Sequence, residues 1–170
     1  MSAAATAPGG SRRRVAVAAS ARYPDLREDW PIQRDAMAAL GLDATTAVWT
    51  DREVRWDEYD LVVANGAWDN IHRPTEFLEW VDLVADTGVP IVNSPATLRW
   101  NIDKRYLGDL AAAEVMYGPT AYARVDLVRL EDGSPAVLEL ELLDPALFFE
   151  HHPEGARHFA SVLRDRIQAG

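Results

Sequence analysis

The sequence predicts an α/β fold, with a mainly parallel four-stranded sheet flanked by helices and, after it, a β-hairpin and a terminal helix. Short apolar segments alternate along residues 14–115 with segments whose apolar side chains recur at helical spacing, which is typical of βαβ units. Residues 123–142 hold two alternating segments around an Asp-Gly pair, a strong hairpin signal because glycine tolerates a positive φ. Residues 153–169 have the apolar stripe of an amphipathic helix.

The individual elements follow in chain order. Residues 14–20 are apolar without alternation, as in a strand that is buried on both faces of a parallel sheet. One helix is expected to end before Gly41, a residue that favours helix termination, and Pro74 with Thr75 favours the start of another. We expect strands at residues 14–20, 44–50, 61–64 and 90–93, and helices at residues 25–40, 75–85, 95–113 and 153–169.

Composition and charge limit the classes of partner. The 170 residues carry a formal net charge of −10 and a pI near 4.8, which disfavours a nucleic-acid partner because phosphates are bound by clustered Lys and Arg. No apolar run approaches the ~20 residues that cross a bilayer, so we expect no membrane partner. The lack of cysteine fits a reducing compartment, and we expect a cytoplasmic protein with a small-molecule ligand.

The predicted hairpin pairs residues 123–130 with residues 136–142. If residue 130 pairs with residue 135 beside the turn, Asp126 lies directly opposite Glu139. Alternation along the strands then places Arg124, Asp126, Glu139 and Glu141 on one face and Val125, Leu127, Leu138, Leu140 and Leu142 on the other. We expect the leucine face to belong to the core.

The opposed carboxylates on this hairpin need a neutralising group. Side chains directly across a hairpin have Cβ atoms about 4.5–5.5 Å apart, and like charges at that distance are destabilising. A divalent cation such as Mg²⁺, which prefers oxygen ligands, would neutralise Asp126, Glu139 and Glu141. The alternative is a solvated polar face that Arg124 or Arg129 partly compensates, and the spacing alone leaves both interpretations open.

The motifs around this hairpin resemble those of a known family. Arg-x-Asp on the first strand, Glu-x-Glu on the second and Leu-Asp-Pro-Ala-Leu-Phe after it resemble the C-terminal metal-binding hairpin of ATP-grasp ligases of the glutathione synthetase and RimK-like kind, in the branch of O-ureido-serine cyclo-ligases. Arg-Tyr-Pro-Asp-Leu, Ala-Trp-Asp-Asn and Arg-Trp-Asn-Ile-Asp-Lys-Arg-Tyr-Leu extend the resemblance to the preceding residues. The sequence departs from that branch at Ala146, where serine is common.

The resemblance implies a metal and a nucleotide site. It assigns Mg²⁺, held against the nucleotide phosphates, to Asp126, Glu139 and Glu141. It also makes Lys104 and Arg124 candidates for contact with the nucleotide.

Candidates for binding the substrate lie after the predicted strands. Asn65, Trp68, Asp69 and Asn70 follow the strand at residues 61–64, at the edge where open α/β sheets place their ligands, and Arg22 follows the first strand. The related ligases commonly have an Arg and a Ser before the Trp-Asp pair, and this chain has neither. The resemblance therefore does not name the substrate.

One part of the family is missing from the middle of the chain. Residues 116–122 stand where these ligases carry their whole nucleotide-clamping region. Phosphoryl transfer depends on positioning and on neutralising phosphate charge, so we expect no self-sufficient ATP-dependent ligation, and ATP binding itself is left open. The expected domains are a disordered tail at residues 1–13, a pre-ATP-grasp-like α/β domain at residues 14–115 and a remnant of the ATP-grasp catalytic domain at residues 116–170.

Two functional hypotheses follow. The first is a truncated ATP-grasp-derived protein that binds or acts on a small carboxylate or amino-acid-like ligand with help from Mg²⁺. The second is a non-catalytic interaction partner, as a homodimer or with a full-length ligase, because deletion of the clamping region would expose apolar surface. An internal deletion made in a longer ligase would explain the same sequence.

Overall fold

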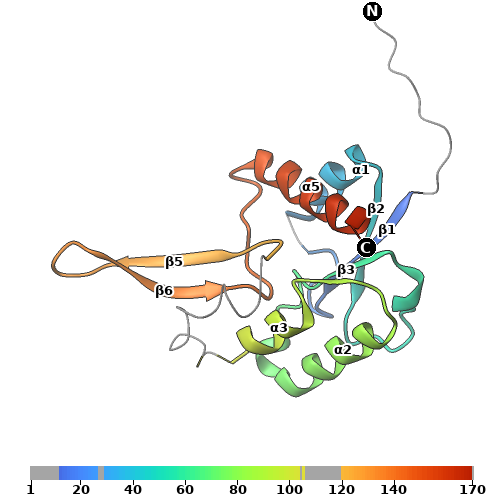
Figure 1. Ribbon diagram of the computed structural model, residues 1–170, viewed down its shortest axis with the longest axis horizontal. Coiled ribbons are helices and arrows are strands. Elements are labelled where there is room, and N and C mark those ends of the chain that lie inside the picture. Colours follow the sequence, from blue (N-terminus) through green and yellow to red (C-terminus); the bar gives the residue numbers. More distant parts are fainter. Residues whose placement is uncertain (1–11, 27–28, 104, 106–119, 170) are drawn as a thin grey trace, which may run out of the picture.

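The computed structural model describes residues 12–26, 29–103, 105 and 120–169. It confirms the predicted α/β fold. Four parallel strands form one sheet in the order β2-β1-β3-β4, so that β1 and β3 lie inside it (Figure 1). The strands are β1 (Arg13–Ala19), β2 (Leu42–Val48), β3 (Leu61–Val63) and β4 (Ile91–Val92).

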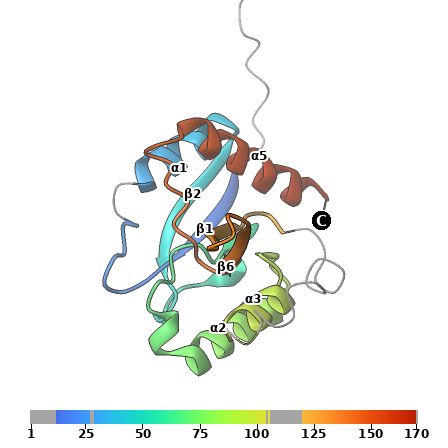
Figure 2. The same cartoon turned by 90° about the vertical axis from the view of Figure 1, so that its left-hand side faces the viewer.

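Helices cover both faces of this sheet. Helices α1 (Asp29–Ala39) and α5 (Pro153–Ala169) lie side by side on one face, and α2 (Pro74–Asp86) and α3 (Pro95–Asn101) lie on the other (Figure 2). Short 3-10 turns at Trp56–Glu58 and Asn70–His72 lead into β3 and α2. The terminal helix therefore completes the layer that α1 begins, although the two are far apart in the sequence.

Successive side chains of β1 point to opposite faces of the sheet, so the interior consists of two cores. Val15 and Val17 point to the α1 and α5 side, where they meet Met37, Phe159 and Leu163. The other face of the sheet carries an aromatic core whose members are Trp49, Trp56, Phe77 and Trp80. Residues 15–19 of β1 are buried on both faces and are all apolar, as predicted, whereas Arg13 and Arg14 at its start are exposed.

A two-stranded antiparallel hairpin projects from this body (Figure 1). It consists of β5 (Arg124–Arg129) and β6 (Pro135–Glu141), and Asp126 pairs with Glu139 as predicted. Near the turn the predicted register is wrong, since Arg129 rather than Leu130 pairs with Pro135. An irregularity after Asp126 absorbs the difference, because Leu127 pairs with Val137 and leaves one extra residue on β6.

The prediction that the leucine face belongs to the core is also wrong. Leu127 is 62% exposed and Leu138 is 58% exposed, and Val125 and Val137 are exposed as well. The reason is that the hairpin projects from the body, so no helix or sheet among the described residues packs along either face. Only Leu142, just beyond the end of β6, enters the core.

The base of the hairpin is attached to the sheet by buried polar side chains. Asn93 Nδ2 donates to the carbonyl oxygens of Tyr122 and Leu142 at 3.0 and 2.6 Å. Asn101 Nδ2 donates to the carbonyl oxygen of Leu140 at 2.9 Å, and its Oδ1 accepts from the N–H of Leu142 at 2.8 Å. The Tyr122 hydroxyl donates to the carbonyl oxygen of Leu143 at 2.8 Å. The backbone at the hairpin base thus has partners although it joins no larger sheet.

Several predictions concern parts that the structure does not describe. The helix predicted to run to residue 113 is described only as far as Asn101, where α3 ends. Lys104 lies outside the described residues, as do 106–119. The domain boundaries stay a prediction. In the described ranges, no helix is both long enough and apolar enough to span a membrane.

Candidate functional site

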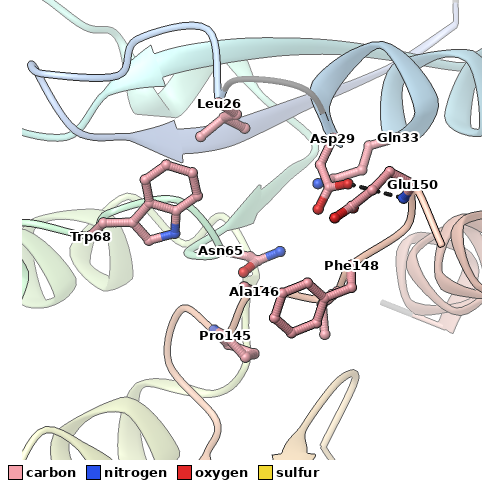
Figure 3. Close-up of a pocket in the computed structure, with 10 residues that line it drawn as sticks. Leu26, Asp29, Gln33, Asn65, Trp68, Pro145, Ala146, Phe148 and Glu150 are labelled. Carbon is pink, nitrogen blue, oxygen red and sulfur yellow. Dashed lines mark hydrogen bonds between the residues drawn. The ribbon is translucent and has the colours of Figure 1, made fainter.

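A pocket of about 220 Å³ lies where β1 and β3 end. We call it the strand-end pocket. Residues from three parts of the chain line it: the loops after β1 and β3, the first turns of α1, and the segment that follows the hairpin (Figure 3). Its lining residues are Leu26, Asp29, Gln33, Asn65, Trp68, Pro145, Ala146, Leu147, Phe148 and Glu150.

Close packing of the loop after β3 positions one wall of the pocket. Gly66 has a φ of +154°, and its carbonyl accepts from the N–H of Ser20 at 3.0 Å. A Cβ at Gly66 would lie 2.5 Å from the carbonyl oxygen of Ala18, so only glycine fits here. Trp68, two residues on, packs edge-to-face against Tyr23 with ring centroids 5.6 Å apart.

Two carboxyl groups lie together on the other side. The backbone N–H of Glu150 donates to Asp29 Oδ1 at 3.2 Å (Figure 3). Burial, followed by the hydrogen bond with and the charge of the neighbouring Glu150, raises the pKa of Asp29 to about 6. The hydrogen bond from Asp29 lowers the pKa of Glu150. The two side chains therefore share a proton in mildly acidic solution, and at neutral pH they present negative charge.

A further polar atom of the lining is an acceptor without a partner. Gln33 is 4% exposed, and its Oε1 has no hydrogen-bond partner within the described part of the chain. Buried polar atoms usually have a partner, so this oxygen marks a place where a donor is lacking. Among the residues that the structure describes, the lining contains neither Lys nor Arg. The pocket is therefore suited to N–H donors and positive charge.

The structure divides the residues predicted to bind substrate. Asn65 and Trp68 line the pocket, as expected for residues at the carboxyl end of a strand. Asp69 and Asn70 make intramolecular bonds: Asp69 Oδ1 accepts from Trp49 Nε1 at 2.7 Å. The buried side chain of Asn70 donates to Asp144 Oδ2 at 2.7 Å and ties this loop to the segment after the hairpin. Their role in substrate binding stays a prediction.

Arg22 lies beside the pocket rather than in its lining. Its guanidinium is 5.2 Å from the centroid of the Tyr23 ring, which in turn packs against Trp68. The side chain is exposed. Arg22 thus contacts Tyr23, which contacts Trp68, so its positive charge lies on the Trp68 side of the pocket.

On the hairpin, the predicted acidic face is present and carries its own counterion. Arg124 forms ion pairs with Asp126 at 3.1 Å and with Glu141 at 2.8 Å. In the described ranges, no group of three or more His, Cys, Asp or Glu side chains is arranged to hold a metal ion. The arrangement favours the compensated polar face that the spacing had left open, and the magnesium and nucleotide sites stay predictions.

Sequence reasoning missed Asp29, Gln33 and Glu150. Asp29 and Gln33 lie one turn apart on α1, where an Asp in a first helical turn is ordinary. Glu150 is 121 residues from Asp29 in the sequence, and no spacing rule connects them. Their common position depends on how the segment after the hairpin packs.

The chain matches known proteins most clearly along its first half. Residues 15–93 match the family model of the N-terminal domain of D-cycloserine synthetase DcsG. The cycloserine biosynthesis protein DcsG of Streptomyces lavendulae is 36% identical over 92 residues, which are 54% of this chain and 30% of that protein. The predicted family resemblance is confirmed. The similarity to DcsG spans less than a third of that relative's length, and it includes one side of the strand-end pocket but not residues 145–150.

A solved structure shares the fold over most of the chain. The crystal structure of D-cycloserine synthetase DcsG superposes with a TM-score of 0.80 at 18% identity, covering 91% of this chain and 99% of that one. A RimK domain ATP-grasp protein from Sphaerobacter thermophilus DSM 20745 has a TM-score of 0.42 at 19% identity, covering 92% of this chain and 60% of that one. The first TM-score shows a common fold, and the second is too low to show one.

Proposed function

We propose that this DcsG-like protein binds a small amino-acid-like compound in the strand-end pocket, with the ammonium group of the compound beside Asp29 and Glu150. The observation that carries the proposal is the lining itself, in which the described residues combine two adjacent carboxyl groups with an unpartnered buried acceptor and include no basic side chain. An ammonium group relieves the repulsion between neighbouring carboxylates and supplies N–H donors to these acceptors.

The other end of the ligand has a complementary group nearby. Arg22 is the exposed cation beside the Tyr23 and Trp68 rings, and a carboxylate or carbonyl at the mouth of the pocket would lie on that side. Trp68 offers an apolar wall for the atoms in between. A cavity of about 220 Å³ suits a compound no larger than a small amino acid derivative.

We do not propose that the protein carries out ATP-dependent ligation by itself. The seven residues 116–122 replace the region with which the related ligases hold the nucleotide. Without groups to position and neutralise the phosphates, phosphoryl transfer has little catalytic support. Binding, or a reaction that needs no nucleotide, is the function that the pocket supports.

Magnesium at the hairpin is a separate proposal. Asp126, Glu139 and Glu141 supply oxygen ligands of the kind that Mg²⁺ takes, but Arg124 already pairs with two of them. A cation therefore has to compete with the guanidinium. A thermal unfolding titration with Mg²⁺ or Mn²⁺ tests this: a rise in Tm that Asp126→Ala abolishes supports the site, and an equal response of parent and variant excludes it.

The pocket is tested with ligands that differ only at the amine. The relatives are named for D-cycloserine, so we choose D-cycloserine, D-serine and N-acetyl-D-serine as probes. We expect the two free amines to raise Tm in a saturable way and the acetylated compound to have no effect. Asp29→Asn should weaken binding about tenfold, because a charge-assisted hydrogen bond is lost.

The matched control for this experiment lies on the same helix. Asp35 is exposed and pairs only with Arg34 among the described residues, so Asp35→Asn changes the net charge equally without touching the pocket. Binding of N-acetyl-D-serine as tight as that of D-serine, or equal affinity of Asp29→Asn and the parent for D-serine, would contradict the proposed function.

The exposed hairpin favours a second candidate function, self-association. A two-stranded hairpin is at best marginally stable in water, yet this one exposes Val125, Leu127, Leu130, Val137 and Leu138. The N–H of Leu130 donates to the carbonyl oxygen of Ser134 across the hairpin. Because backbone groups alternate in direction along a strand, every second N–H of β5 points away from β6, to the unpaired edge of the hairpin. Antiparallel pairing of β5 between two copies would extend the sheet and give the side chains of β5 apolar neighbours across the new strand pair.

Sedimentation velocity over a range of protein concentrations tests this candidate. We expect a dimer in the parent and a monomer after Leu127→Glu, because a charge at the centre of β5 opposes its twin across the twofold axis. Ile71→Glu, which replaces an apolar residue that is 66% exposed on the body, is the control and should leave the dimer intact. A monomeric parent at all concentrations would exclude self-association and leave a full-length ligase as the partner to test.

A further inference from the structure

A second cavity, of about 310 Å³, lies on the opposite face of the sheet from α1 and α5. It is bounded by the loop after β2 and by helix α2, and neither element contributes to the strand-end pocket. Trp49, Trp56 and Trp80 line it together with Asp51, Glu76 and Glu79. We call it the tryptophan pocket.

The aromatic wall of this pocket is firmly held. Trp56 and Trp80 pack edge-to-face with ring centroids 5.4 Å apart, and Trp49 and Trp80 do so at 6.3 Å. All three side chains are at least 95% buried, with Phe77 behind them. Such a wall is largely preorganised and needs no more than a small shift of the Trp80 indole to receive a ligand, so little ordering entropy is lost on binding.

The charge around the wall favours a cation. Three carboxylates line the pocket against one guanidinium, that of Arg52. The protein itself places a cation on this cluster: the Arg73 guanidinium lies 5.4 Å from the centroid of the Trp49 ring and pairs with Glu76 at 2.7 Å. Indole rings attract cations through their negative faces, most strongly when water is excluded. Glu79, one turn along α2, has no ion-pair partner among the residues that the structure describes.

A polar atom in the wall also lacks a partner. The Nε1–H of Trp80 is buried and has no hydrogen-bond acceptor in the described part of the chain. A buried donor without an acceptor is unfavourable, and an acceptor brought by a ligand would relieve that cost after a small shift of the indole. Since three carboxylates surround the pocket, a neutral acceptor such as an amide oxygen suits it better than a carboxylate.

We propose that the tryptophan pocket binds a small apolar ammonium compound that carries a neutral hydrogen-bond acceptor, as an amino acid amide does. The ammonium group lies beside Glu79, the apolar body against the indoles, and the acceptor on Trp80 Nε1. The site is independent of the proposed function, because the two pockets share no lining residue.

L-Leucinamide is the probe, followed through the indole N–H signals in ¹H–¹⁵N spectra. N-acetyl-L-leucinamide lacks the cation and L-leucine lacks the neutral acceptor, so both should bind at least about three- to tenfold more weakly. The titration is run near pH 6.5, below the pKa of roughly 7.7–8 of an α-amino group, so that the probe is charged. The Trp80 signal, assigned by its loss in Trp80→Phe, should shift most.

Variants separate this site from the strand-end pocket. Glu79→Gln should weaken leucinamide binding about three- to tenfold, whereas Glu154→Gln, an exposed change on α5, should not alter it. Asp29→Asn should leave the Trp80 shift intact even if it abolishes binding in the strand-end pocket. Because Glu79 is exposed, its replacement does not threaten folding. No saturable shift of the Trp80 signal, or an equal affinity of Glu79→Gln and the parent, overturns the proposal.

Discussion

Replacement of Asn93 tests how the hairpin is joined to the sheet. Asn93 follows β4 and is 2% exposed. Its Nδ2 donates to the carbonyl oxygens of Tyr122 and Leu142, and its Oδ1 accepts from the N–H of Ala121 at 2.6 Å. One side chain thus provides partners for backbone groups on both sides of the hairpin. Asn93→Ala removes all three bonds and leaves those groups buried.

The magnitude follows from the number of groups left without a partner. Each costs about 1–3 kcal/mol, and because the three are neighbours that relax together, we expect a total of about 3–5 kcal/mol rather than the full sum. In a chain of this size 1 kcal/mol changes Tm by about 2–4 °C, so Tm should fall by roughly 6–20 °C. Asn101→Ala removes two bonds and should cost less, about 2–3 kcal/mol.

Guanidinium unfolding followed by circular dichroism measures both variants against Gln168→Ala. Gln168 is exposed on α5, so its replacement should change stability by less than about 0.5 kcal/mol. Hydrogen exchange supplies the local readout, since the Ala121 amide should exchange faster in Asn93→Ala while amides of β1 keep their relative protection. A loss for Asn93→Ala no larger than that for Gln168→Ala would falsify this account of the hairpin base.

Three further predictions concern other parts of the structure. The pKa of Asp29 is higher in the folded state than in the unfolded state. Its contribution to stability is therefore present below pH 3.8 and is lost as the pH rises through about 6, so Tm should fall over this range. Asp29→Asn should remove that fall in Tm. Gly66→Ala should cost about 2–4 kcal/mol in chemical unfolding because its Cβ meets backbone, whereas Gly133→Ala, which meets no atom within 4 Å, should cost about 1 kcal/mol. Arg124→Met should lower stability by about 1 kcal/mol, less in high salt, and should raise any affinity for Mg²⁺ measured by thermal shift.

The parallel sheet could be predicted because its signals are local. A run such as Val15–Ala19 is apolar on both faces wherever helices cover both faces, and the residues between strands carry helical spacing. The pairing of Asp126 with Glu139 agrees with the prediction only because the irregularity after Asp126 offsets the one-residue error in the register beside the turn. The exposure of Leu127 was not, because alternation identifies two faces without showing whether anything packs against either.

The site was predictable only where a topological rule applies. Asn65 and Trp68 follow β3, and the rule that ligands bind at the carboxyl ends of parallel strands found them. Asp29 and Glu150 meet across 121 residues of sequence, and their contact depends on the buried bonds of Asn70 and Asn93. Such bonds from amide side chains to groups far away in the sequence have no sequence pattern.

The two groups of residues that line the strand-end pocket differ in how they relate to DcsG. The matched residues 15–93 supply Asn65, Trp68 and Asp29, so this side has counterparts in the DcsG N-terminal domain. Glu150 and Ala146 lie on the other side, beyond the matched region. Because the second carboxyl group of the pair comes from that side, the proposed affinity for an ammonium group would depend on residues whose relation to DcsG is one of fold alone. Glu150→Gln should therefore weaken amine binding while leaving the Trp68 wall unchanged, and the choice of ligand should follow residues 145–150 more closely than the conserved fold.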